Sequence, residues 1–233
     1  MAVTPDGIIT DSELCKMCGK CAEVCPTKAI ELSGRVMTVN DIMDIIEKER
    51  IFFDQSGGGV TFSGGEPLVH IKMLTELLDE CRKRGIHTAI DTAGNVSTGI
   101  ILEMAEKTDL FLYDMKMIDS FLHRKWIGSG NERILYNLRA IAETGIQIII
   151  RIPLIGGVND TDENIELTAK FISDLAGHKK EVHLLPYHSI AQNKYTKLGK
   201  PDDFEKLQEP DKKTLSKAIE KFGEFGIRAS VGG

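Results

Sequence analysis

Four of the five cysteines fall in one short run, CKMCGKCAEVCP, which contains Cys15, Cys18, Cys21 and Cys25. Gaps of two residues let three thiolates bind three irons of one cubane cluster, and Pro26 turns the chain away after the fourth. A zinc site is the alternative, because two C-x2-C steps also suit tetrahedral thiolate ligation. The Cys-Pro ending and the TKAIEL that follows favour the cluster, so the run predicts a 4Fe-4S site.

The spacing is that of bacterial ferredoxins, in which the fourth cysteine of a run can ligate a second cluster. Only one such run is present here. Either Cys25 completes the same cluster, or its partner cysteines lie upstream of Met1. Cys81 stands alone in LLDECRKRG and is expected to be a buried, unreactive thiol on a helix.

A second group of chemically capable residues follows short apolar runs. In VTFSGGEPL, Gly64 and Gly65 would let a ligand approach the backbone, and Glu66 adds a carboxylate at the end of a strand. Asp91 and Asp114 would repel each other at neighbouring strand ends unless a cation lay between them. The other segments of this kind are DTAG (91–94), LYDMK (112–116), HRKWIGSGN (123–131), RIPLIGGVND (151–160) and LLPYH (184–188).

These residues must be positioned by alternating strands and amphipathic helices, a pattern typical of βα units around a parallel sheet. The apolar runs predict strands at 59–63, 86–90, 109–113, 147–152 and 181–186, with a weaker sixth at 227–231. Periodicity alone does not distinguish a doubly wound sheet from a barrel. Residues 1–35 have little apolar periodicity and are predicted to be a small metal-ordered module, and residues 36–233 the α/β domain.

Composition narrows the function classes. The formal net charge of −6 argues against a nucleic-acid partner. No apolar run approaches the length of a membrane span, and the first residues lack the pattern of a signal peptide. We therefore expect a cytoplasmic protein without a membrane partner. The cysteines cluster as metal ligands do and are not dispersed as in a disulfide framework.

Together these segments resemble the glycyl radical enzyme activating proteins of the radical S-adenosylmethionine (SAM) superfamily, relatives of the pyruvate formate-lyase activating enzyme. The similarity covers nearly the whole chain. It implies a partial (β/α)6-type barrel that lacks its first strand, with the ferredoxin-like 4Fe-4S segment at the N-terminus. It also implies an enzyme that uses SAM and a reduced 4Fe-4S cluster to generate a glycyl radical on a partner enzyme, with an electron donor such as flavodoxin or ferredoxin.

The resemblance assigns roles at the strand ends. The turn of Gly64, Gly65 and Glu66 would bind the amino group of SAM. Lys116 and His188 would bind its carboxylate, which needs cationic or hydrogen-bonding partners in a partly dry site. Asp91, Thr92 and Asp114 match a monovalent-cation site beside that carboxylate. Arg151 matches an arginine at the rim of the barrel that helps to orient SAM.

One departure bears directly on activity. The family requires a C-x3-C-x2-C run whose cluster keeps one iron open for SAM, and the sequence contains no such run. We therefore expect an N-terminal truncation, no catalytic residues in this chain, and no activity of the chain alone. The alternative is a catalytically inactive SAM-pocket protein or an iron–sulfur electron carrier. Finding C-x3-C-x2-C upstream of Met1 would decide between them.

Overall fold

The computed structural model describes residues 2–4, 7–11, 13–32, 34–177, 180–188 and 207–232. Contacts between residues divide the chain into two units, Met1–Ile42 and Met43–Gly233. The division falls within helix α2 (Val39–Lys48), beyond the predicted module of residues 1–35. Within the described ranges, no helix is both long and apolar enough to cross a membrane.

The first unit holds little regular structure. Strands β1 (Ala2–Thr4) and β2 (Gly7–Ile9) pair as an antiparallel hairpin. A single helical turn, α1 (Lys20–Glu23), follows within the cysteine run and buries none of its residues. The cysteines therefore lie on a segment without a hydrophobic core of its own.

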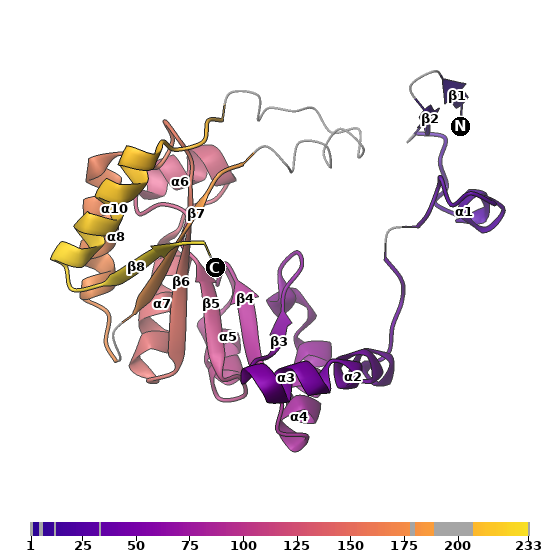
Figure 1. Cartoon of the computed structure of the whole chain (residues 1–233), viewed down its shortest axis with the longest axis horizontal. Helices are drawn as coiled ribbons and strands as arrows, with labels where there is room; N and C mark the ends of the chain where they lie inside the picture. The colour runs from indigo at the N-terminus through magenta and orange to yellow at the C-terminus, as the bar shows by residue number, and fades with distance from the viewer. Residues whose placement is uncertain are drawn as a thin grey trace. The chain divides into compact units, whose positions relative to one another are not determined.

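The second unit is built on one parallel sheet with the strand order β3-β4-β5-β6-β7-β8 (Figure 1). All six predicted strands are confirmed. They are β3 (Gly59–Phe62), β4 (His87–Thr92), β5 (Leu110–Asp114), β6 (Gln147–Leu154), β7 (Glu181–Pro186) and β8 (Arg228–Val231). Across the described residues β3 and β8 each pair with one neighbouring strand, so the sheet is open.

Helices precede β3 and connect the strands that follow it. They are α3 (Arg50–Ser56), α4 (Ile71–Lys83), α5 (Thr98–Ala105), α6 (Ser120–Ile127), α7 (Glu132–Glu143), α8 (Asp162–Ser173) and α10 (Lys212–Glu224), with a 3-10 turn η1 (Pro67–His70) before α4. Several begin at side chains that accept a hydrogen bond from the first turn, as Asp119, Thr161 and Asp211 do for α6, α8 and α10. Figure 1 shows α7, α8 and α10 along one side of the strands.

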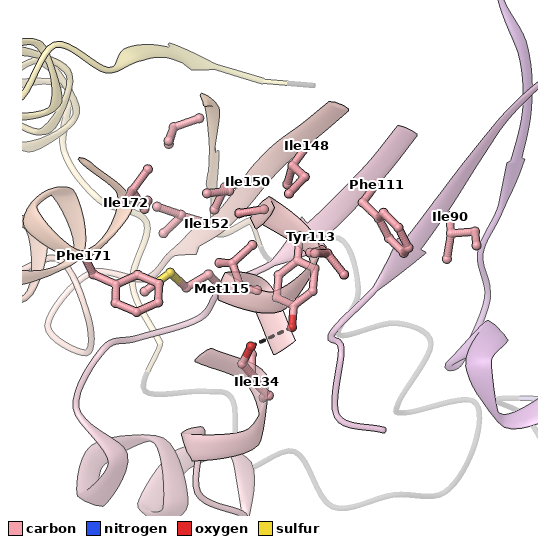
Figure 2. Packing of buried hydrophobic residues seen from close by; sticks show 14 of the residues in the cluster. Ile90, Phe111, Tyr113, Met115, Ile134, Ile148, Ile150, Ile152, Phe171 and Ile172 are labelled. Atoms are coloured by element: carbon pink, nitrogen blue, oxygen red, sulfur yellow. Dashed lines mark hydrogen bonds between the residues drawn. The ribbon is translucent and has the colours of Figure 1, made fainter. Parts of the chain in front are cut away.

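The strands present two different faces. On the face toward the helices, side chains such as Ile90, Phe111 and Ile150 are fully buried in one apolar cluster with residues of α4, α5, α7, α8 and α10 (Figure 2). The Tyr113 hydroxyl is buried there too and donates to the Ile134 carbonyl at 2.7 Å. This core fixes the register of the sheet, because a slip of one residue would turn every apolar side chain to the other face.

The opposite face carries the polar residues. Parallel pairing sets Asp91 beside Leu112 and Asp114 beside Arg151, and all of these side chains are partly buried. Since all six strands run in the same direction, the segments that follow them leave from one edge of the sheet. The sheet thus brings the strand-end motifs together at its carboxyl edge.

Candidate functional site

The turn after β3 is shaped by two glycines. Gly64 and Gly65 have φ values of +89° and +62°, a left-handed backbone that side chains rarely adopt. A Cβ atom added at either position would meet no atom within 4 Å. The backbone of this turn is therefore bare and bordered by open space, which is what a ligand in contact with the main chain requires.

Glu66 ties this turn to the end of β4. One of its carboxylate oxygens accepts from the Thr92 hydroxyl (2.7 Å) and from the Leu68 amide (3.2 Å), and the other accepts from the Ala93 amide (3.1 Å). A carboxylate has about four acceptor positions. Glu66 therefore organises the loops and keeps one position for a ligand.

Arg151 lies between the two aspartates at the neighbouring strand ends. Its Nη1 is 2.6 Å from Asp91 Oδ2, and its Nε is 3.9 Å from Asp114 Oδ1. Ser63 also donates its hydroxyl hydrogen to Asp91 (3.1 Å). A guanidinium therefore lies between the two acids in the described structure, and the monovalent-cation site stays a prediction.

Asp114 remains incompletely satisfied. Lys116 Nζ lies 3.4 Å from its Oδ2, while its buried Oδ1 has no hydrogen-bond partner in the described part of the chain. Burial raises the pKa of the Asp114 carboxyl; Lys116 and Arg151 oppose this rise, and the charge of Asp91 adds to it. This oxygen therefore keeps an acceptor position that no described donor fills.

His188 is less closely connected to the others. It is exposed and lies two residues beyond β7, where the Tyr187 amide extends the pairing to β6 by donating to Leu154 O at 2.8 Å. No hydrogen bond among the described residues links His188 to the other predicted site residues. The structure thus brings together Glu66, Asp91, Thr92, Asp114, Lys116 and Arg151, and places His188 at the same edge with no hydrogen bond to them within the described ranges.

Sequence reasoning missed the groups that hold the loops of the site. Four buried asparagines, Asn131, Asn137, Asn159 and Asn164, each donate their side-chain amide to backbone carbonyls around the carboxyl edge. The available signal was their position: Asn131 and Asn159 end the glycine-containing GSGN and GGVN segments that follow β5 and β6. An asparagine in such a loop can both donate to and accept from the main chain.

The cysteine run has a different geometry. Cys15, Cys21 and Cys25 are partly buried and Cys18 is exposed. Within the described ranges, no three side chains of His, Cys, Asp or Glu lie close enough together to hold a metal ion. The four cysteines are therefore not gathered into a ligand shell, and the cluster stays a prediction from the donor set.

Two details of this segment fit a chain that wraps around a ligand. Met17 and Lys28 are the non-glycine residues with positive φ in the described structure, and Gly19 also adopts this conformation. Hydrogen bonds, first from the Ile30 backbone and then from Thr27, lower the pKa of the Cys25 thiol, which favours the thiolate form that binds iron.

Cys81 contrasts with this run. It is fully buried in α4, and burial raises the pKa of its thiol to about 11. The prediction of a buried thiol is confirmed, and the raised pKa agrees with the low reactivity expected of it. Two hollows of about 310 and 410 Å³ also lie away from the candidate site, at the opposite edge of the sheet, where they are lined by His87 and Asp109 and by Gln147 and Lys180.

The comparisons with known proteins identify the family of the chain. The model of the radical SAM superfamily matches residues 15–172. The chain belongs to this superfamily. Within it, the chain belongs with the glycyl radical enzyme activating enzymes, so the family predicted from the motifs is confirmed.

Three relatives illustrate the similarity. The trans-4-hydroxy-L-proline dehydratase activating enzyme of Clostridioides difficile is 39% identical over 97% of this chain and 85% of its own length. The isethionate sulfite-lyase activating enzyme of Oleidesulfovibrio alaskensis is 39% identical over 84% of this chain and 63% of its own. The pyruvate formate-lyase 2-activating enzyme of Escherichia coli is 33% identical over 94% of this chain and 75% of its own.

A solved structure supports the fold. A domain of a pyruvate-formate lyase-activating enzyme from Bacteroides vulgatus is 37% identical, with a TM-score of 0.65, over 76% of this chain and 99% of the domain. The open six-stranded sheet is thus a partial radical SAM barrel, as predicted. Radical SAM enzymes use a 4Fe-4S cluster and SAM, and the relatives above place this chain among the radical SAM enzymes of the activating type.

Proposed function

We propose that the complete protein generates a glycyl radical on a partner enzyme and that the carboxyl edge of the sheet is its SAM site. The observation that carries the proposal is the convergence at this edge of the bare Gly64–Gly65 turn with Glu66, Asp114 and Lys116. When bound, SAM and a reduced 4Fe-4S cluster would supply the one-electron chemistry that removes a hydrogen atom from a glycine residue.

The residues at the edge match the polar groups of SAM in charge. The free acceptor position of Glu66 and the main chain of the Gly64–Gly65 turn suit its ammonium group. Lys116 suits its carboxylate. His188, two residues beyond the end of β7, would bind the same carboxylate. Arg151 acts on SAM indirectly, because its guanidinium already binds Asp91 at 2.6 Å.

Binding of the carboxylate would change the pairing of Lys116. In the structure the Lys116 ammonium is 3.4 Å from Asp114, so the ligand competes with Asp114 for the same charge. Asp114 would then keep only its longer contact with Arg151, at 3.9 Å, and a monovalent cation near Asp91, Thr92 and Asp114 would restore the balance.

The cysteine run has a supporting role in this proposal. Its four thiols would hold an auxiliary 4Fe-4S cluster that relays electrons or stiffens the segment. The electron donor would be a small redox protein such as flavodoxin or ferredoxin, and the compartment the cytoplasm. The particular glycyl radical enzyme is left open, because each relative is named for a different partner.

Calorimetry with SAM tests the site directly. We expect the chain, reconstituted with iron and sulfide, to bind SAM and Lys116→Ala to weaken that binding about tenfold, since a charge-assisted hydrogen bond is lost. Lys170→Ala on the exposed surface of α8 is the matched control and should bind as the wild type does. Equal affinity of the wild type and Lys116→Ala would reject the site.

The radical chemistry needs a second experiment. The complete protein, reduced without oxygen and mixed with SAM and a candidate glycyl radical enzyme, should give the electron paramagnetic resonance signal of a glycyl radical. If SAM binds normally and no candidate partner acquires a radical, the alternative of an inactive SAM-binding protein or an electron carrier gains support.

A further inference from the structure

The loop that carries Lys116 depends on side chains for its backbone hydrogen bonds. The regular ladder between β5 and β6 ends when the Met115 amide donates to Arg151 O at 2.9 Å. Beyond that point Asn159 binds the Lys116 carbonyl, Asn131 binds the carbonyls of Met117 and Ile118, and Asn164 accepts from the Ile118 amide. Three asparagines from outside the loop therefore determine its path.

Asn159 is the member of this group that touches Lys116 itself. It lies in the loop after β6 and is 2% exposed. Its Nδ2 donates to Lys116 O at 2.6 Å and to Pro153 O at 2.7 Å, while its Oδ1 accepts from the Ile155 amide at 2.8 Å. Each polar atom of the side chain is thus matched to the main chain, and the amide joins the loop of β5 to the end of β6.

The backbone of Asn159 is itself bound by a side chain of α8. Its own carbonyl accepts from Asn164 Nδ2 at 2.7 Å, and Asn164 belongs to the first turn of α8, where Thr161 accepts from its backbone amide. The connection therefore runs from a helix packed on the core, through two buried amides, to the backbone of Lys116. Such a connection fixes the point from which the lysine side chain extends.

We propose that Asn159 is a positioning residue that places the Lys116 ammonium for the carboxylate of SAM, an inference that rests on the proposed function. The chemistry requires an amide here. Aspartate has the same shape but no donor, so at this position its carboxylate would face two carbonyl oxygens at hydrogen-bond distance. The substitution would push Lys116 out of place without changing the volume of the side chain.

The test compares SAM with its decarboxylated analogue, which keeps the adenosine, sulfonium and amine but lacks the carboxylate. In calorimetry with the reconstituted chain, Asn159→Asp should raise the Kd for SAM about tenfold and leave the Kd for the analogue within about twofold of wild type. In a Lys116→Ala background, Asn159→Asp should have no further effect on SAM, because both act on one contact.

Asn137→Asp is the matched control. Asn137 is fully buried and donates to the carbonyls of Gly94 and Val96, both at 2.8 Å, in the loop after β4. Its aspartate variant should lose a similar amount of stability, and any loss of binding should affect both ligands equally. If Asn159→Asp does not fold, Asn159→Ser, which retains one donor, takes its place and should show the same preference for the analogue.

The outcomes separate this inference from the proposed function. Equal loss of both ligands in the Asn159 variants, or unchanged SAM binding, would overturn the positioning role while Lys116→Ala still weakens SAM binding. The carboxylate site and this inference would both be overturned if the wild type bound SAM and the analogue with equal Kd and Lys116→Ala left the Kd for SAM unchanged.

Discussion

In the parallel sheet, strand pairing over a continuous apolar core fixes the positions of the candidate site residues. The cysteine segment, residues 13–32, carries its four thiols without such a core. Phe111 and Ile90 in the sheet are fully buried. In the cysteine segment Leu14, Met17 and Val24 are each more than three-quarters exposed. Apolar burial is what orders a chain without ligands, so the sheet is organised in advance. For the cysteine segment, metal binding stays the predicted source of order.

This difference in burial explains why, among the described residues, the strand-end side chains lie together and the cysteines do not. Contacts across strands β3 to β6 hold Glu66, Asp91, Asp114 and Arg151 in place. The cysteines have no comparable support, and a cluster would contribute the bonds that bring them together. The proposed SAM site on a rigid edge and the predicted iron–sulfur site on a segment without a core therefore place different demands on the sequence.

Removing one thiolate should give the largest effect. We expect Cys18→Ala to abolish the 4Fe-4S cluster of the reconstituted chain, because the segment has no other means of closing a ligand shell. Iron content and visible absorbance measure the loss. Cys81→Ala, which removes a buried thiol of the sheet unit, should keep the cluster; an intact brown chromophore in Cys18→Ala would contradict the assignment.

The second prediction concerns SAM cleavage. The sequence has no C-x3-C-x2-C run, so the chain should form no 5′-deoxyadenosine from SAM even when it is strongly reduced. Chromatography of the quenched reaction provides the measurement. Formation of 5′-deoxyadenosine by the purified, reduced chain would show that the Cys15–Cys25 run can supply the cluster that a C-x3-C-x2-C run normally binds. The cysteine segment would then have a catalytic role and not only a supporting one.

A third prediction compares the cores directly. Phe111→Ala in β5 should lower the free energy of unfolding by about 3–5 kcal/mol, since it opens a cavity beneath the sheet. Val36→Ala, in the first unit, should change it by less than about 0.5 kcal/mol, because Val36 is fully exposed. Urea denaturation of the two variants tests this, and similar losses would mean that the first unit has a core that burial does not reveal.

The sequence was sufficient for the features that depend on local pattern. Apolar runs predicted the six strands, and the strand-end motifs predicted which edge carries the site. It was not sufficient for contacts between distant residues: the Arg151 guanidinium between Asp91 and Asp114, the bond from Thr92 to Glu66, and the amide of Asn159 on Lys116 depend on register and on the path of loops. Helix α6, which contains His123, was likewise unpredicted, because its short polar segment shows little apolar periodicity.

The last and smallest effect concerns Asp114, whose charge is costly because its carboxyl is partly withdrawn from water. Burial raises the pKa of Asp114, so the folded state binds its proton more tightly than the unfolded state does. Stability therefore falls as the pH rises from the ordinary aspartate pKa through the raised value, and above it the full cost remains. Asp114→Asn should abolish this pH dependence and stabilise the chain without SAM at neutral pH by less than about 1 kcal/mol, since Lys116 and Arg151 already offset part of the cost.

Melting temperatures measured from pH 4 to pH 8 should show that the stability gained by Asp114→Asn grows with pH. A gain that is constant with pH, or a loss at neutral pH, would mean that the pairing with Lys116 outweighs the burial of the charge and that Asp114 contributes to stability as well as to the site.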